Sequence, residues 1–206
     1  MAVHSAALLS GAGTMSARGD QTRKKIRDEA RLLFSEKGFS AVTMKDICDR
    51  TGLSRGGLYR HYGSTAEIFR DIFTAENGSQ NDLIAQTIEQ NGSAAEVMDI
   101  LLNVLYAEMI DSETSLSLAI CEYGQNCDSG FIKEMHLYSV EKWSSLLEYG
   151  IRRKEFAPVN VQETVDLLLA SYQGVRMFSR ILPKWSTSAA SIITHFRNLL
   201  KPENND

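Results

Sequence analysis

Apolar residues recur at helical spacing along nearly the whole chain, and this pattern constrains the fold more than any other feature. The three prolines, at positions 158, 183 and 202, each stand where a helix can end or a loop begin. No segment gives a convincing strand pattern, and we find no internal repeat. The sequence therefore predicts an all-α fold of about nine helices.

The boundaries of these helices follow from apolar stripes and from Ser, Thr or Asn residues that can cap a first turn. Glycines at positions 38 and 52 provide stop signals. The pair Asn77-Gly78 can kink or split the fourth helix, and the sequence leaves both outcomes open. We expect helices near residues 22–37, 44–51, 55–62, 65–88, 97–107, 115–125, 130–153, 161–182 and 186–200.

Charge is distributed unevenly along the 206 residues, whose formal net charge is −4. Residues 1–75 contain 12 Lys and Arg against 8 Asp and Glu, whereas the remaining residues contain 10 against 18. This contrast indicates a basic working end on an acidic body, although a solvated surface can produce the same numbers. The 43% hydrophobic content suits one globular domain or two small ones.

Several features exclude other classes of protein. Residues 1–20 are small and polar, without a signal-peptide core, so we expect a disordered tail in which Met15 is an alternative start. No run approaches the roughly 18 apolar residues that a membrane span needs, and we expect a cytoplasmic protein. The three cysteines and four histidines lack disulfide or zinc-ligand spacing, so we expect no metal and no cofactor.

The segment from Asp46 to Phe69, DICDRTGLSRGGLYRHYGSTAEIF, concentrates positive charge and glycine in a few residues. Two short helices joined by a glycine turn form a helix-turn-helix, with Ile47, Leu53 and Leu58 as the apolar contacts between them. The major groove of DNA is about 12 Å wide and admits one such helix.

Residues at the start of the second helix would meet base edges. Ser54 caps this helix, and Arg55 can donate two hydrogen bonds to guanine. Gly56 and Gly57 favour helix poorly, but their missing side chains would let the backbone approach DNA closely. Further along the exposed side lie residues suited to phosphate oxygens: Tyr59, Arg60, His61 and Ser64. Such helix pairs are common, however, and Arg60 can be an ordinary solvated side chain.

The segment AVTMKDICDRTGLSRGGLYRHYGSTAEIF, residues 41–69, resembles the signature of the TetR family of bacterial transcription regulators. It departs conservatively at five positions, and substantively at Thr65, where the family usually has a phosphate-contacting lysine. The resemblance extends over about residues 22–73. The matching residues are Thr43, Ile47, Gly52, Ser54, Gly56, Leu58, Tyr59, His61 and Ser64.

This resemblance implies a DNA-binding head at residues 21–65 and a helical body at 66–206 that dimerises and often encloses an effector pocket. The family's DNA contacts carry over to Thr43, Lys45, Arg55, Gly57, Tyr59 and His61. The family's dimer interface, built by the last two helices, would include Leu167, Ser171, Gly174, Val175, Phe178, Ile192, Ile193 and Phe196. Some of these residues can instead belong to the core of a single chain.

A pocket for a small molecule needs mostly apolar walls and a few polar groups. The body offers Met98, Tyr106, Met109, Tyr123, Trp143, Tyr172, Gln173, Arg176 and Met177 as candidates for such walls. Aromatic residues and methionines at helical spacing can equally be core. Arg176 can meet an anionic ligand or pair with a glutamate of the acidic body.

The sequence therefore predicts a regulator, in the family's default a repressor, that binds a palindromic operator as a homodimer and is released by an unknown small molecule. An alternative is a DNA-binding dimer without an effector, architectural or regulated by another protein. A third reading, which Thr65 and the paired glycines make conceivable, is an interaction module that has lost DNA binding. An enzyme is not expected, because Gly-x-Ser-x-Gly, phosphate-loop and metal motifs are absent.

Overall fold

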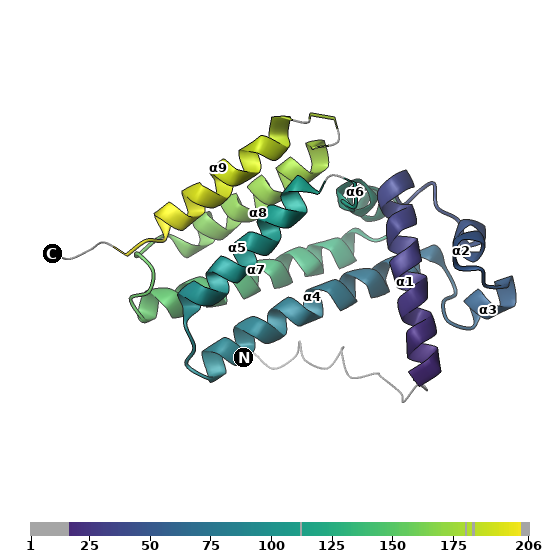
Figure 1. Ribbon diagram of the computed structural model, residues 1–206, viewed down its shortest axis with the longest axis horizontal. Helices are drawn as coiled ribbons and strands as arrows, with labels where there is room; N and C mark the ends of the chain where they lie inside the picture. Colours follow the sequence, from purple (N-terminus) through teal and green to yellow (C-terminus); the bar gives the residue numbers. More distant parts are fainter. Residues whose placement is uncertain (1–16, 112, 180, 183, 203–206) are drawn as a thin grey trace.

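The computed structural model describes residues 17–111, 113–179, 181–182 and 184–202. Within these residues the chain forms nine helices and no strand, which confirms the expected all-α fold. Three short or transverse elements lie at one end of the molecule, and long helices extend from there toward the other end (Figure 1). Of the helices in this part of the chain, none is both long enough and apolar enough to cross a bilayer.

The N-terminal end contains α1 (Ala17–Lys37), α2 (Met44–Thr51) and α3 (Arg55–Tyr59), and α1 packs on α2. Helix α1 begins inside the segment expected to be a disordered tail, so residues 17–20 are helical, while residues 1–16 lie outside the described chain. Helix α3 ends three residues before its expected end, because the chain turns at Arg60 to bring Tyr62 into the core.

Helix α4 (Thr65–Glu89) starts in this head and runs into the body without a break at Asn77-Gly78. Helix α8 (Val161–Phe178) ends four residues earlier than the apolar pattern indicates. The other body helices are α5 (Ala94–Ile110), α6 (Ser117–Asn126), α7 (Ser129–Arg152) and α9 (Lys184–Leu199). Helices α5, α7, α8 and α9 run lengthwise beside one another, with α8 and α9 along one edge, whereas α6 is seen end-on next to the head (Figure 1).

The core of the head is shared with α6 and α7. Phe69 of α4 stacks on Tyr123 of α6, with ring centroids 4.8 Å apart, and Phe34 of α1 meets Phe69 edge-on at 5.2 Å. Phe131 at the start of α7 closes the same aromatic cluster. The head is therefore docked on the body through buried aromatic rings, which contribute more than area burial alone.

Candidate nucleic-acid interface

The start of α2 is fixed by a reciprocal cap between Thr43 and Asp46. The Thr43 hydroxyl oxygen accepts from the Asp46 backbone N–H at 3.2 Å, and the Thr43 N–H donates to the Asp46 carboxylate at 2.9 Å. The Thr43 hydroxyl and Lys37 also donate to this carboxylate, and these hydrogen bonds lower the pKa of Asp46. Thr43 is exposed as a DNA contact requires, but its hydroxyl is engaged in starting the helix.

The turn between α2 and α3 depends on Gly52, whose φ of 73° lies in the left-handed region that glycine adopts without strain. Its backbone N–H donates to the Cys48 carbonyl at 2.9 Å and closes the end of α2. Lys25 of α1 donates to the Thr51 carbonyl at 2.8 Å, so α1 also holds this end in place. The buried side chains of Ile47 and Leu58 set the angle between the two helices.

Helix α3 presents Arg55, Gly56 and Tyr59 outward. Ser54 caps it by accepting from the Gly57 N–H at 3.1 Å. A side chain at Gly56 would meet no atom within 4 Å, so the protein itself leaves that position open. Gly57 is buried, and a Cβ there would lie 3.2 Å from the Ser54 hydroxyl. The Ser54 cap therefore explains why residue 57 is a glycine. No contact within the chain explains the glycine at position 56.

A polar network behind α3 holds it against α1 and α4. The Tyr62 hydroxyl donates to Asp71 of α4, which also accepts from Arg27 at 3.0 Å. Burial, with the hydrogen bond to Asp71, raises the pKa of the Tyr62 hydroxyl. Arg23 lies over the Tyr62 ring and donates to the His61 carbonyl at 2.9 Å. His61 is half-buried, and Arg60 and Tyr59 remain exposed.

The basic side chains of the head fall into two groups. One group, among the described side chains of α1 and the end of α2, pairs with carboxylates of the chain, as Arg23, Arg27, Lys37 and Arg50 do. Among the described residues, Lys45, Arg55 and Arg60 are exposed and make no ion pair. The helix-turn-helix therefore offers positive charge that no carboxylate of the described chain neutralises.

The start of α4 is capped by Ser64, which accepts from the Glu67 N–H at 3.2 Å. The Glu67 carboxylate in turn accepts from the Gly63 N–H at 2.6 Å. Ser64 and Thr65 are both half-buried. Thr65 therefore lies in the first turn of a capped helix. The backbone N–H groups of this turn favour an anion even though residue 65 is not a lysine.

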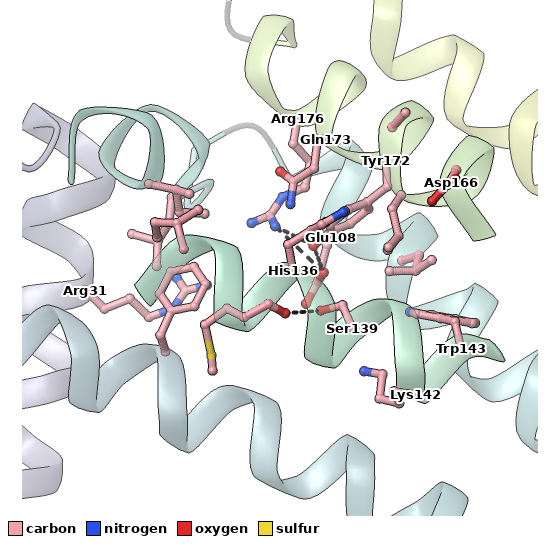
Figure 2. Close-up of a pocket in the computed structure, with 18 residues that line it drawn as sticks. Arg31, Glu108, His136, Ser139, Lys142, Trp143, Asp166, Tyr172, Gln173 and Arg176 are labelled. Atoms are coloured by element: carbon pink, nitrogen blue, oxygen red, sulfur yellow. Dashed lines mark hydrogen bonds and ion pairs between the residues drawn. The ribbon is translucent and has the colours of Figure 1, made fainter. Parts of the chain in front are cut away.

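The body contains a cavity of about 590 Å³ (Figure 2). Four of the side chains expected in a pocket line it: Trp143, Tyr172, Gln173 and Arg176. The cavity also reaches the head, because Arg31 of α1 and Phe73 of α4 belong to its wall. Its volume lies within the range of small-molecule sites, about 300–1,000 Å³.

Five of the expected pocket residues lie elsewhere. Met98 and Met109 are buried in the body core, and Tyr123 is buried in the aromatic cluster between head and body. Tyr106 is exposed, and Met177 is half-buried outside the cavity lining. The structure assigns these side chains to packing or surface, because the apolar periodicity that suggested them does not distinguish the helix faces.

Charged and polar residues that sequence reasoning missed also line the cavity. They include Arg31, Glu108, His136, Ser139, Lys142 and Asp166 (Figure 2). Only the position of Lys142, next to Trp143, offered a signal. Lys142 is 6% exposed, and this burial lowers the pKa of its ammonium group, with nearby Glu108 opposing the shift.

Three polar side chains of the lining are joined by hydrogen bonds: Arg176, Tyr172 and Glu108. Arg176 donates to the Tyr172 hydroxyl, which donates to the Glu108 carboxylate, and the Arg176–Glu108 ion pair measures 4.0 Å. Burial raises the pKa of Tyr172. The Nε of Arg176 is buried and has no hydrogen-bond partner within the described chain. Arg176 thus pairs with a glutamate, the second of the two roles considered for it.

The residues expected in a dimer interface separate into two sets. Val175, Ile193 and Phe196 are buried in the core of the single chain. Leu167 and Phe178 are exposed, at 60% and 43%, and the remaining three are half-buried: Ser171, Gly174 and Ile192. Leu167 and Phe178 are about three turns apart and therefore lie on the same face of α8, where they form an exposed apolar stripe. Ile181 and Leu182, beyond the end of α8, are exposed as well.

Comparisons with a family model and with curated proteins both identify transcriptional regulators as the relatives of this chain. Residues 26–72 match the family model for bacterial regulatory proteins, tetR family. The chain is 31% identical to YfiR, an uncharacterized HTH-type transcriptional regulator of Bacillus subtilis, over 71% of this chain and 73% of YfiR. It is 23% identical to the HTH-type transcriptional repressor KstR2 of Rhodococcus jostii, over 82% of each chain.

Solved structures share the fold. The reduced form of NemR from Escherichia coli superimposes with a TM-score of 0.69 over 88% of this chain and 99% of NemR, at 11% identity. GusR of Salmonella enterica superimposes with a TM-score of 0.62 over 87% of this chain and 95% of GusR, at 20% identity. At these identities the likeness concerns the fold alone.

Proposed function

Because the chain belongs to the TetR family of bacterial regulatory proteins, we propose that it is a repressor that binds a palindromic operator as a homodimer and releases it when a small molecule occupies the body. Family membership makes the chain a DNA-binding transcriptional regulator. The dimer, the operator symmetry and the effector are the additions that we argue for below.

The exposed cations of the helix-turn-helix carry the proposal. We assign Arg55 and the open backbone at Gly56 to base edges in the major groove, since both lie exposed in the first turn of α3. We assign Lys45, Tyr59 and Arg60 to phosphates, together with Thr43, His61 and Ser64 near the helix ends. Ser54 and buried Gly57 would shape the turn rather than touch DNA.

The apolar stripe on α8 supports a homodimer. Leu167 and Phe178 expose large apolar side chains, and a side chain at Gly174 would meet open space. Exposed apolar surface of this kind marks association sites. A symmetric pair would carry two copies of α3, and operators for such pairs have half-sites about 34–36 Å apart, one helical turn, or multiples of it.

The cavity supports an effector over an effector-free regulator, because its volume of about 590 Å³ lies within the range of small-molecule sites. Arg31, which lines it, also donates to the Thr114 carbonyl at 3.2 Å and so joins α1 to the body. A ligand that binds better when the head is displaced would lower operator affinity. A 100-fold loss requires about 2.7 kcal/mol of coupling, within the usual range.

Selection from random duplex DNA tests the operator. We expect recovery of an inverted repeat with two half-sites, protected by two subunits per duplex. Recovery of a sequence without two-fold symmetry, or of no preferred sequence at all, would contradict the proposal. The source genome then shows which promoters contain the repeat.

The dimer is tested by Leu167→Glu, which places a charge on the apolar stripe of α8. We expect light scattering to show monomers and operator affinity to fall by at least about tenfold, since one head then binds alone. Leu137→Glu is the matched control, because Leu137 of α7 is 65% exposed and lies outside the proposed interface. If both variants remain dimeric, α8 does not form the interface.

A further inference from the structure

The cavity of the body opens to water between α7 and α8. Most of the described side chains that line it are buried or half-buried. The exposed residues of this lining come from two helices only, His136 from α7 and Asp166, Ala170 and Gln173 from α8. Figure 2 shows His136 on α7 and Asp166 and Gln173 on α8. Because exposed lining residues mark where a cavity meets solvent, the mouth lies along one side of α8.

Ala170 connects this mouth with the apolar stripe of α8. Residues three and four positions apart in a helix are neighbours on its surface. Ala170 follows Leu167 by three residues and precedes Gly174 by four, so it lies beside both of them. Ala170 also lines the cavity, and Gln173, three residues further along, lines it as well. The mouth of the cavity and the apolar stripe therefore share a border.

The stripe belongs to a row of residues that is spaced for helix packing. Leu167, Ser171, Gly174 and Phe178, which we call the α8 seam, follow one another at intervals of four, three and four residues. Coiled coils use this alternation for their a and d positions. Large apolar side chains stand at both ends of the seam, exposed by 60% and 43%. At its centre a Cβ on Gly174 would meet no atom within 4 Å, so another helix has room to approach closely.

A second copy of α8 fits this seam. Two identical subunits related by a two-fold axis present the same surface to each other, and an apolar seam complements itself in that way. Residues that flank an a and d seam also contact the partner helix, and Ala170 holds such a flanking position. A helix with its side chains is about 10–12 Å across, so one that lies on the seam extends over the neighbouring mouth.

We propose that the effector site is complete only in the homodimer, in which α8 of the second copy closes the mouth of the cavity. This inference rests on the proposed function, because it adds a wall to the proposed effector site and takes that wall from the proposed interface. Ligand sites enclose most of their ligand, whereas the single chain leaves Ala170 and Gln173 open to water. A ligand held only in the closed cavity then stabilises the dimer that closes it.

A thiol inside the cavity reports whether the mouth is open. Ser139 of α7 lines the cavity and lies outside α8, so Ser139→Cys introduces a reactive group there with little change in size. N-ethylmaleimide is added to the whole chain, and mass spectrometry of its peptides gives the labelling rate at each cysteine. Cys127 is exposed at the end of α6, outside the lining, and serves as the reference within the same sample.

The comparison is between dimers and monomers of Ser139→Cys. We expect the introduced thiol to react at least about tenfold more slowly in the dimer, after division by the rate at Cys127, because the partner helix covers the mouth. Leu167→Glu supplies one monomer. Gly174→Glu supplies a second whose fold is not at risk, since its side chain meets open space in the single chain. Leu137→Glu is the matched control, which should keep the slow rate of the dimer.

Failure of this inference can be told apart from failure of the proposed function. If the two seam variants are monomers and the introduced thiol reacts equally fast in monomers and dimer, α8 forms the interface without closing the cavity, and the inference alone is overturned. If both seam variants remain dimers, the interface lies elsewhere, and the proposed interface falls together with the inference. If the thiol is protected as expected but no compound releases the selected operator, closure of the cavity is supported and the proposed regulatory mechanism fails instead.

Discussion

The carboxylate of Glu122 on α6 accepts a 2.8 Å hydrogen bond from the backbone N–H of Ser40, in the loop that leads into α2. Asn126, one turn further along α6, donates to the Ser40 hydroxyl at 3.2 Å. Ile120 on the other side of α6, and Leu116 directly before its first residue, line the cavity. One short helix therefore touches both the proposed effector site and the approach to the helix-turn-helix.

Removing the Glu122 carboxylate should loosen this connection. In Glu122→Ala we expect the Ser40 amide to exchange with solvent at least about tenfold faster, because its local hydrogen-bond acceptor is lost. Global stability should fall by about 1 kcal/mol or less, since Ser40 is exposed and water can replace the acceptor. Hydrogen exchange measured by NMR gives the first result, and urea unfolding gives the second.

Glu122→Gln provides the matched control, because an amide oxygen can still accept from the Ser40 N–H. Its Ser40 exchange should stay close to that of the unaltered protein. Equal acceleration in both variants would mean that the charge, rather than the hydrogen bond, holds the loop.

The geometry of the helix-turn-helix could be predicted because its signals are local. Thr43 and Asp46 are three residues apart and form the cap that their spacing predicts, and Gly52 takes the left-handed conformation expected of a stop. Ser54 and Ser64 cap their helices for the same reason. Each of these decisions depends on atoms within one turn of chain.

The lining of the cavity could not be predicted in the same way. Tyr172, Glu108 and Lys142 come from α8, α5 and α7, and only tertiary packing brings them together. Charged residues are ordinarily placed on the surface, so Glu108 gave no signal, and Lys142 gave none beyond its position next to Trp143. The prediction that Tyr123 lines the pocket was wrong, because its ring stacks on Phe69 of α4, and this partner cannot be identified from the sequence of α6.

Lys45→Ala should change how operator binding depends on salt. Lys45 is exposed in the first turn of α2 and is assigned to a phosphate. The logarithm of the affinity falls linearly with the logarithm of the salt concentration. Each lost phosphate contact makes this negative slope shallower by about 0.9, counted once per subunit. Affinity for all operator variants should fall together. Titrations at several salt concentrations measure the slope, and an unchanged slope would remove Lys45 from the interface.

Arg55→Ala should act on one base pair of each half-site. The guanidinium of Arg55 is exposed at the start of α3 and is assigned to guanine. Its loss should cost about 1–3 kcal/mol on the preferred operator and leave little preference at that position. Binding to a series of single-base variants measures this. A uniform loss across the series would make Arg55 a phosphate contact instead.

Lys142→Met should stabilise the protein without ligand at neutral pH. Burial lowers the pKa of Lys142 below its ordinary 10.5, because water solvates the ammonium group better in the unfolded chain than in the folded one. Removing it should raise the free energy of unfolding by roughly 1 kcal/mol, whereas exposed Lys133→Met should change it by less than about 0.5 kcal/mol. Urea unfolding near pH 7 makes both measurements.

The stabilisation should shrink as pH rises toward 10.5. Between the lowered folded-state pKa and 10.5 the unfolded chain binds more protons, so the unaltered protein gains stability with pH in that window. The methionine variant lacks this gain. A difference between the two proteins that grows with pH would contradict the assignment of Lys142 as a buried ammonium.

Glu155→Gln should remove part of the acid sensitivity of the body. Although burial opposes the shift, hydrogen bonds from Arg153, the Ala95 N–H and the Ser93 hydroxyl lower the pKa of Glu155 to about 2. Its folded-state pKa lies below the ordinary 4.5, so the stability that it contributes is present above that value and disappears as pH falls toward about 2. For a partly exposed carboxylate this contribution is on the order of 1 kcal/mol.

Glutamine keeps an oxygen that can accept from Ser93 and Ala95, so the substitution isolates the charge. We expect the unaltered protein to be the more stable of the two near pH 6, and the difference to vanish near pH 2. The hydrogen-bonded Asp46 titrates in acid in both proteins, so the difference between their unfolding free energies is the quantity to follow. A difference that stays constant from pH 6 to pH 2 would mean that packing, and not ionisation, explains the effect of the substitution.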